Sequence, residues 1–387
     1  MQKLKIAFVS VARNPVPPKI NTINGISTIS AIIAEELQAK GHEVNFFCMK
    51  GSTVHTQRTE TSLYSVTEFY GDQYYNALPD RVRTELQQPF NAELHLLLLE
   101  NIAKNYYDII QFHTYPTIFS LSFSRRITIP KVFTFHNQFS EPYNKILDIY
   151  AADKNNYFVS ISLAQRKFIS AIKYIGNIYH GIDTNFFNYN ENDNNYIFYS
   201  GRFHPEKGLD MAISTAKKTN KKLIFTGQES SSGSAYYDKD IKPFIDNTLI
   251  INQKLDTQKE LVKLYSEAKL FLLPIRYEES FGLVFAEAMS TGTPVIAFAK
   301  GSVPEIIKDG QTGFIVNPSD TDIRGDWIIK KTGIEGLCEA VERIYAMPAD
   351  QYRQMRQDCR KHVEEKFTVE RMVDEYEKVY QKIINST

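Results

Sequence analysis

The stretch that decides the fold is PIRYEESFGLVFAE, residues 274–287. The apolar run 270–274 predicts a buried strand, and residues 283–291 predict the helix that follows the loop. On open α/β sheets, ligands bind outside the carboxyl ends of the strands, where loops lead into helices. The stretch therefore predicts an α/β sheet with a ligand-binding loop at its edge.

Two acids of this stretch, Glu279 and Glu287, are eight residues apart. In a helix that spacing gives a rise of about 12 Å and an angle of about 80°. A glycosidase acid and nucleophile lie roughly 5 to 5.5 Å apart, or roughly 6.5 to 9.5 Å for inversion, so a hydrolytic pair is disfavoured. We place Glu279 in the loop, facing a sugar, and Glu287 one to two turns into the helix. The spacing alone is equally consistent with two glutamates that are exposed to solvent on a helix and contact no ligand.

The segment between the two acids favours an anion. Gly282 allows a ligand to approach the backbone. The unpaired N–H groups near Leu283 and Val284 mark a helix N-terminus, where partial positive charge attracts anions. A diphosphate fits such a site.

A second motif, GRFHPEKG at 201–208, also directly follows an apolar strand. Arg202 offers a planar fork and Lys207 a compact charge, the two kinds of cation that bind phosphate. The motif lacks the P-loop pattern GxxxxGK[ST]. By itself it fits a turn that caps the next helix, but the anion site at 279–287 lies in the same predicted domain.

Outward from these motifs, short apolar runs alternate with helical patterns along the whole chain, which is typical of parallel βαβ units. At 387 residues the chain exceeds one ordinary core, so we expect two domains. The predicted strands of the first half are 5–11, 43–48, 108–112, 131–135, 157–161 and 176–179, and those of the second half are 196–200, 222–226, 249–251, 270–274, 294–298 and 313–316. Predicted helices include 27–40, 210–218, 259–268 and 283–291, and the chain is helical from 333 to 385.

The polar stretch NYNENDNNY, centred on residues 189–195, predicts the interdomain linker. The expected domains are therefore residues 1–190 and 191–366. A C-terminal helix, 367–387, is expected to return to the first domain.

In the first half, the loop from Pro15 to Gly25 follows the first strand, where a ligand loop belongs. Gly25 and its neighbouring N–H are placed to meet a phosphate or an acceptor, although a rigid proline-rich connector explains the loop equally well. His136 follows the strand 131–135 and is placed to hydrogen-bond a sugar. His113 follows the strand 108–112, and we interpret it as a packed histidine.

Composition excludes several classes of protein. Lys plus Arg and Asp plus Glu both number 45, which argues against a nucleic-acid binder. The three cysteines lack metal or redox spacing, and no run reaches the ~18 apolar residues of a membrane span. We expect a cytoplasmic protein, at most peripheral to a membrane. The motifs GxGxxG, HExxH and GxSxG are absent, and the DxD triplets 238–240 and 320–322 fit surface turns.

Taken together, GRFHPEKG at 201–208, EESFGLVFAEAMSTGTPVIAF at 278–298 and GSVPEIIKDGQTGFIV at 301–316 resemble the family-4 (GT4) glycosyltransferases with the GT-B fold. The resemblance extends from PVPP at 15–18 to HGID at 180–183. It implies two Rossmann-like domains facing across a cleft, with the nucleotide held by the C-terminal domain and the acceptor mainly by the N-terminal one. It also implies retention of configuration, a nucleotide-sugar co-substrate and no bound metal or other cofactor.

The resemblance further implies a role for individual residues. Arg202 and Lys207 match the cations that bind the donor diphosphate. Glu279 and Glu287 match the EX7E pair, which contacts sugar hydroxyls and ribose. The remaining matches are the backbone segment Phe281, Gly282, Leu283 and Val284, the sugar-proximal histidine His136, and the second glycine of a GG loop, Gly25.

The chain departs from the family pattern at two places. Asn24 replaces the first glycine of the GG loop, and Ser302 stands where a second glycine is common. Our first expectation for the donor is UDP-glucose or a similar UDP-hexose, with GDP-mannose second, and the acceptor stays open among glycan, lipid, protein and small molecule. The alternatives are another GT-B activity, such as an epimerase or phosphorylase, and a non-catalytic nucleotide-sugar-binding protein.

Overall fold

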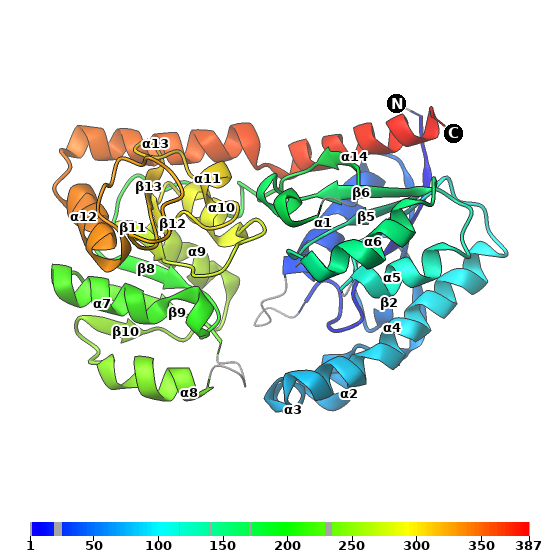
Figure 1. Cartoon of the computed structure of the whole chain (residues 1–387), viewed down its shortest axis with the longest axis horizontal. Helices are drawn as coiled ribbons and strands as arrows, with labels where there is room; N and C mark the ends of the chain where they lie inside the picture. The colour runs from blue at the N-terminus through cyan, green and yellow to red at the C-terminus, as the bar shows by residue number, and fades with distance from the viewer. Residues whose placement is uncertain are drawn as a thin grey trace. The chain divides into compact units, whose positions relative to one another are not determined.

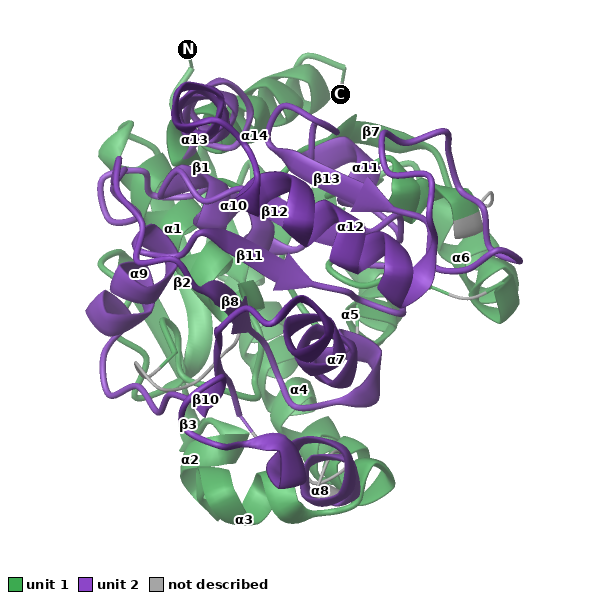
Figure 2. Ribbon diagram, turned by 90° about the vertical axis from the view of Figure 1, so that its left-hand side faces the viewer, with its two compact units in different colours: residues 1–181, 369–387 green, residues 182–368 purple. Residues whose placement is uncertain are grey.

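The computed structural model describes residues 2–18, 25–115, 117–139, 141–169, 172–228 and 234–386. The chain forms two compact units, coloured separately in Figure 2. Unit 1 comprises residues 1–181 and 369–387, and unit 2 comprises residues 182–368. Each unit is a parallel β-sheet with helices packed against it (Figure 1). The predicted α/β class with two parallel sheets is confirmed.

Unit 1 contains a seven-stranded sheet with the order β3-β2-β1-β4-β5-β6-β7. Its strands are β1 (Lys5–Val9), β2 (Glu43–Lys50), β3 (Gln57–Tyr64), β4 (Ile109–Phe112), β5 (Lys131–Thr134), β6 (Asn156–Ser160) and β7 (Tyr174–Asn177). Its helices are α1 (Gly25–Ala39), α2 (Val66–Tyr70), α3 (Asp72–Ala77), α4 (Asp80–Ile102), α5 (Thr117–Ser124), α6 (Asn144–Ala151) and α14 (Val369–Ile384).

The region between β2 and β4 differs from the prediction. Its sequence pattern predicts no strand, yet β3 pairs with β2 at the sheet edge, and α2, α3 and α4 follow. The strand β3, QRTETSLY, is mostly polar and has one buried residue, Thr61. An edge strand needs no apolar run because one side and much of its surface face solvent, so the apolar pattern misses it.

The C-terminal helix α14 is part of unit 1 and packs against α1 (Figure 2). Lys40, just after α1, forms ion pairs with Asp374 at 2.7 Å and with Glu377. On the sheet side, the Tyr376 hydroxyl lies 3.0 Å from Thr134 Oγ1, and the Tyr380 hydroxyl donates to Gln111 Oε1. The helix thus contacts both its neighbour helix and the strands β4 and β5.

Unit 2 contains a six-stranded sheet with the order β10-β9-β8-β11-β12-β13. Its strands are β8 (Ile197–Ser200), β9 (Leu223–Thr226), β10 (Ile250–Asn252), β11 (Leu270–Leu273), β12 (Val295–Phe298) and β13 (Gly313–Val316). Its helices are α7 (Leu209–Thr219), α8 (Ser234–Tyr236), α9 (Gln258–Ser266), α10 (Leu283–Ser290), α11 (Val303–Ile306), α12 (Gly333–Tyr345) and α13 (Ala349–Lys366).

The strand order of each sheet reverses at one place. In unit 2, β8 pairs with β9 on one side and with β11 on the other. Every residue of β8 and β11 is buried, as expected for parallel strands covered on both faces. Such a reversal is the usual ligand site of an open α/β sheet, and the loops 201–208 and 274–282 both begin there.

The polar stretch 189–195 is not the boundary between the units. The division falls after Gly181 and again after Thr368, so the stretch belongs to unit 2. Arg356 is fully buried and holds it there, with Nη2 donating to the Asn190 carbonyl at 2.7 Å. Its Nη1 donates to the Ala268 carbonyl at 3.1 Å. The turn-forming residues correctly indicated an irregular segment. The hydrogen bonds from Arg356, which is distant in sequence, make this segment part of unit 2.

Within the described residues, no helix combines the length and the apolar character that crossing a membrane requires.

The two loops at the reversal of unit 2 touch through Gly208. This glycine has a φ of 72°, and a Cβ built on it would lie 2.2 Å from the Pro274 carbonyl oxygen. A side chain of any size would therefore separate the loop 201–208 from the loop 274–282.

We expect Gly208→Ala to destabilise unit 2 by more than the strain of placing alanine at a positive φ would explain. Gly333 in the same unit also has a positive φ, 55°, but its nearest neighbour lies 3.4 Å away. Gly333→Ala should cost about 1 kcal/mol, and Gly208→Ala at least about 2 kcal/mol more, because the clash adds to the strain. Urea unfolding of both variants measures the difference; equal losses would contradict the assigned contact.

Candidate functional site

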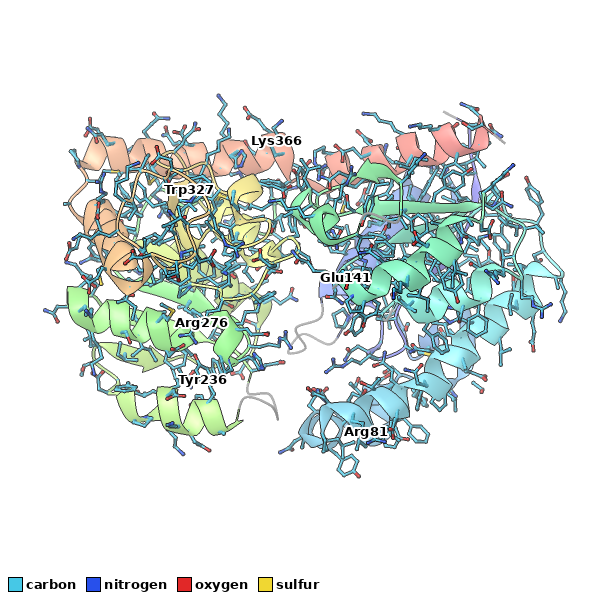
Figure 3. All side chains as sticks on the ribbon, in the orientation of Figure 1. Arg81, Glu141, Tyr236, Arg276, Trp327 and Lys366 are labelled. Atoms are coloured by element: carbon cyan, nitrogen blue, oxygen red, sulfur yellow. The ribbon has the colours of Figure 1, made fainter. Side chains whose placement is uncertain are left out.

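Arg276, labelled in Figure 3, follows β11 and holds the loops after β8 and β11 together. Its backbone N–H donates to the Glu206 carbonyl at 2.7 Å, and its Nη1 donates to the Pro205 carbonyl at 3.0 Å. Its guanidinium also pairs with Asp210, which accepts a 2.7 Å hydrogen bond from the Tyr236 hydroxyl. The two predicted motifs of unit 2 are therefore one structural element.

Lys207 and Glu279, one from each motif, meet in this element. Lys207 Nζ donates to Glu279 Oε2 at 3.1 Å, and the two side chains are 16% and 13% exposed. Tyr277 completes the cluster: its hydroxyl accepts from Lys207 Nζ and donates to Glu279 Oε2. Its ring centroid lies 4.7 Å from Lys207 Nζ, in the range of a cation–π contact. We call these three residues the Lys207 cluster.

The cluster keeps Glu279 ionised at neutral pH. Burial opposes ionisation of this carboxyl, but the Lys207 charge and the Tyr277 hydroxyl outweigh it and hold the pKa of Glu279 below its usual value. Burial, reinforced by the Glu279 charge, raises the pKa of Tyr277 well above its usual value. The cluster therefore presents an ammonium, a neutral phenol and a carboxylate, which suits a ligand with both anionic and hydroxyl groups.

Arg202 stands apart from this network. Its side chain is exposed, and the guanidinium makes no hydrogen bond or ion pair with any residue in the described ranges. It is near enough to Tyr277 and Tyr199 to oppose the rise of their pKa values by its charge. The structure thus brings Arg202 to the same strand end as Lys207 and leaves its planar donors available to an anion.

The loop 301–302 fixes the backbone of the β11 loop from the other side. Gly301 N–H donates to Glu278 Oε2 at 2.6 Å, and Ser302 N–H donates to the Glu279 carbonyl at 2.9 Å. The Ser302 hydroxyl is buried and donates to the Phe281 carbonyl at 2.8 Å. Serine at this departure from the family pattern therefore adds a bond that glycine lacks.

The predicted backbone segment 281–284 forms the start of α10. The Phe281 side chain is buried against the Phe367 ring, with centroids 5.7 Å apart, so only its backbone lies at the loop surface. Gly282 is the N-cap residue with a φ of 84°. Leu283 and Val284 are partly exposed, and their N–H groups lack partners within the helix because they open its first turn. The structure thus contains the helix N-terminus that the sequence predicted.

Glu287 has different surroundings from Glu279. It lies in the second turn of α10, and its Oε2 accepts a 3.2 Å hydrogen bond from the Tyr265 hydroxyl. Burial raises its pKa to about 7. Because α10 begins only at Leu283, the helical spacing used to separate the two acids does not apply to the whole interval.

Unit 1 brings a second group of predicted and unpredicted residues together. His136 follows β5, and its Nε2 lies 2.9 Å from Nδ1 of His113, which follows β4. The His180 ring stacks on His136 with centroids 5.4 Å apart. Burial lowers the pKa of His136 to about 3. His113 is indeed packed, as interpreted, but it is also the hydrogen-bond partner of His136.

The remaining sequence candidates are placed as follows. Gly25 is the first residue of α1 and partly buried, whereas Asn24 and the loop 19–24 lie outside the described residues. Asp322 is paired with Lys300 at 2.6 Å and with Arg324 at 2.7 Å, so its triplet is engaged by cations. Among the described residues, no three His, Cys, Asp or Glu side chains are grouped to hold a metal.

Tyr277, Tyr265 and Glu278 also belong to the candidate site, and no sequence motif singled them out. Tyr277 stands two residues before Glu279, but strand and loop patterns do not reveal which side chains of a loop point inward. Tyr265 comes from α9 and reaches Glu287 only through tertiary packing. The sequence feature that could have identified Tyr277 is its position in the loop between the end of β11 and Glu279. Ligands of open α/β sheets bind at loops that follow strand ends.

Two family models match successive stretches of the chain, which overlap at residues 181–186. "Glycosyltransferase Family 4" matches residues 23–186, and "Glycosyl transferases group 1" matches residues 181–331. A D-inositol 3-phosphate glycosyltransferase from Mycobacterium is 34% identical over 137 residues, which are 34% of this chain and 30% of that protein. The match therefore spans less than a third of that relative's length.

Solved structures match the chain over nearly its full length. The sucrose-phosphate synthase of Thermosynechococcus elongatus has a TM-score of 0.77 at 19% identity and covers 100% of both chains. The Anabaena protein HepE, solved in complex with UDP and glucose, has a TM-score of 0.70 at 16% identity, covering 98% of this chain and 100% of that chain. At these identities the likeness shows a common fold.

The raised pKa of Glu287 predicts a pH-dependent stability effect. Its folded-state pKa of about 7 exceeds the usual 4.5, so ionisation of Glu287 lowers the free energy of unfolding. This destabilisation is absent below about pH 4.5, grows between pH 4.5 and pH 7, and is complete above pH 7. The full effect is roughly 3 kcal/mol. Glu287→Gln should therefore be more stable than the unsubstituted protein at pH 8 and similar to it near pH 4.5.

Urea unfolding without nucleotide, at pH 4.5 and pH 8, measures this difference. Glu342→Gln removes the same charge from an exposed position of α12 and serves as the control. A stability difference for Glu287→Gln that does not change with pH would contradict the assigned pKa.

Proposed function

The chain belongs to glycosyltransferase family 4 and has the GT-B fold, and from this premise we propose that it transfers a hexose from a nucleotide-sugar to an acceptor hydroxyl. The observation that carries the proposal is the Lys207 cluster beside the N-terminus of α10. A cation, a helix N-terminus and an ionised carboxylate together match a diphosphate linked to a sugar. In this proposal unit 2 binds the nucleotide of the donor, and unit 1 binds mainly the acceptor.

The proposed reaction retains the configuration at the anomeric carbon. The acceptor oxygen attacks that carbon from the face the diphosphate leaves. The bond between the anomeric carbon and the diphosphate oxygen breaks, and that oxygen takes the proton of the acceptor hydroxyl. Arg202 and Lys207 stabilise the charge that develops on the diphosphate, which lowers the barrier most when the charge is greatest.

The other site residues hold the donor in this proposal. Glu279 accepts hydrogen bonds from sugar hydroxyls, Glu287 accepts from the ribose, and the backbone of residues 281–284 contacts sugar and phosphate. His136 hydrogen-bonds the sugar, and Gly25 contacts the donor from the first loop. Neutralisation by Arg202 and Lys207 lets the reaction proceed without a bound metal or other cofactor.

UDP-glucose is the first donor we propose, and GDP-mannose is the second. The likeness to HepE, whose structure holds UDP and glucose, supports the order. The acceptor is a glycan, a lipid, a protein or a small molecule, and no nucleic acid is involved. We propose a cytoplasmic location, with a peripheral contact to membranes if the acceptor is a lipid.

A nucleotide panel tests the donor. A ligand present at about 100 times its Kd should stabilise the protein by about 2.7 kcal/mol. We expect the largest rise in Tm with UDP and UDP-glucose, compared with GDP, ADP and their sugar conjugates. A larger rise with GDP-mannose would reverse the donor order, and no rise with any nucleotide would contradict the donor site.

Removal of the two cations tests the mechanism. Arg202→Ala and Lys207→Ala should each lower kcat/KM about 100-fold, because each removes a charge that stabilises the departing diphosphate. Arg202→Ala should leave Tm nearly unchanged, since the Arg202 side chain is exposed and makes no hydrogen bond or ion pair with the described part of the chain. Lys259→Ala removes an exposed lysine of α9 and serves as the control.

These assays are run on the full chain in the presence of EDTA, with the transferred sugar measured directly. Full activity of both variants would contradict the assigned roles of the two cations. Activity that returns only with added divalent metal would contradict a metal-free reaction. Isomerisation without acceptor would indicate an epimerase, and cleavage that needs phosphate would indicate a phosphorylase.

A further inference from the structure

Three buried histidines of unit 1 lie together where β4, β5 and β7 end, and the proposed reaction uses only one of them. The Nδ1 atom of His113 is 2.9 Å from the Nε2 atom of His136, and the His180 ring stacks on His136. The His113 ring is itself stacked on Phe8, with centroids 5.0 Å apart. The Tyr376 ring of α14 is a further neighbour of His113, with ring centroids 5.6 Å apart.

Both rings of the hydrogen-bonded pair are neutral at physiological pH. Burial, followed by the influence of His136 and His180, lowers the pKa of His113 well below its usual value. Burial alone lowers the pKa of His136 to about 3. A neutral imidazole has one N–H and one bare nitrogen, so the bond between them contains a single hydrogen. Whichever ring donates it determines the tautomer of both.

The surroundings of His113 select the donor. Its side chain is fully buried, and its Nε2 atom has no hydrogen-bond partner among the described residues. If His136 donated, His113 would carry its hydrogen on this buried Nε2, where the described residues offer no acceptor. A buried N–H without an acceptor is rarer and more costly than a bare acceptor nitrogen. Donation from His113 Nδ1 leaves only a lone pair at that position.

We propose that His113 is a positioning residue that fixes His136 with its hydrogen on Nδ1, so that His136 can only donate from that atom. The role of His136 toward a sugar rests on the proposed function. In that role it hydrogen-bonds a sugar hydroxyl oxygen as a donor and does not act there as a base. The tautomer itself is a property of unit 1 and can be measured without any substrate.

The first experiment is nitrogen-15 NMR of the full chain with labelled histidine. The expected result for His136 is a hydrogen on Nδ1 and a bare Nε2, assigned by its loss in His136→Gln. His113→Leu should remove this single tautomer and give exchange between two forms. His95→Leu, which removes another buried histidine bonded to Asn91 and Ser120, should leave the His136 signal unchanged. A hydrogen on Nε2 of His136 in the unsubstituted protein would overturn the proposal.

The second experiment measures kcat and KM with the donor identified by the nucleotide panel. His113→Leu should lower kcat about tenfold, the usual scale for loss of an orienting partner. His113→Asn should restore most of it, because its side-chain amide can donate to His136 Nε2. Equal losses in the two variants, at unchanged Tm, would overturn the proposal. An inactive unsubstituted protein would contradict the proposed function, and the NMR result would still decide the tautomer.

Discussion

The pairing of β8 with β11 is the contact on which the site of unit 2 depends. Their parallel register, with Leu270 opposite Ile197 and Phe271 opposite Phe198, sets the carboxyl ends of both strands at one edge of the sheet. The loops 201–208 and 274–282 then start side by side. Gly208 lets their backbones touch, and Arg276 holds them with bonds to two carbonyl groups. Lys207 and Glu279 come from these two loops, so their contact depends on this strand pairing.

Burial then divides the ionisable groups into two kinds. Glu279 is largely buried beside Lys207 and Tyr277, and these partners outweigh desolvation and keep it charged. Among the described residues, the Tyr265 hydroxyl alone offsets the burial of Glu287, so the pKa of Glu287 rises to about 7. The same low-dielectric environment therefore produces a fixed charge at one acid and a titratable group at the other. Two glutamates of one motif thus differ because of their neighbours, which come from α9 and from both loops.

The histidines of unit 1 show the same principle without a counter-charge. His113 and His136 lie after adjacent strands, and α14 packs Tyr376 against the first of them. Because no carboxylate is bonded to either ring in the described structure, desolvation keeps both neutral. What distinguishes the two rings is which nitrogen donates the hydrogen bond between them. The buried Nε2 of His113, which has no partner among the described residues, favours donation from His113 Nδ1. A helix from the far end of the sequence thereby contributes to the environment of a site residue.

The amino-acid sequence by itself determined the alternation of strands and helices, the helix N-terminus at 283–284 and the position of each motif after a strand. These features depend on the local spacing of apolar residues and on the positions of glycines, and both can be read from a short segment of sequence. The sequence did not reveal the polar edge strand β3, the anchoring of residues 189–195 by Arg356, or the contacts of Tyr277 and His113. Only the tertiary structure decided these, because hydrogen bonding and burial depend on atoms that packing brings together from distant parts of the chain.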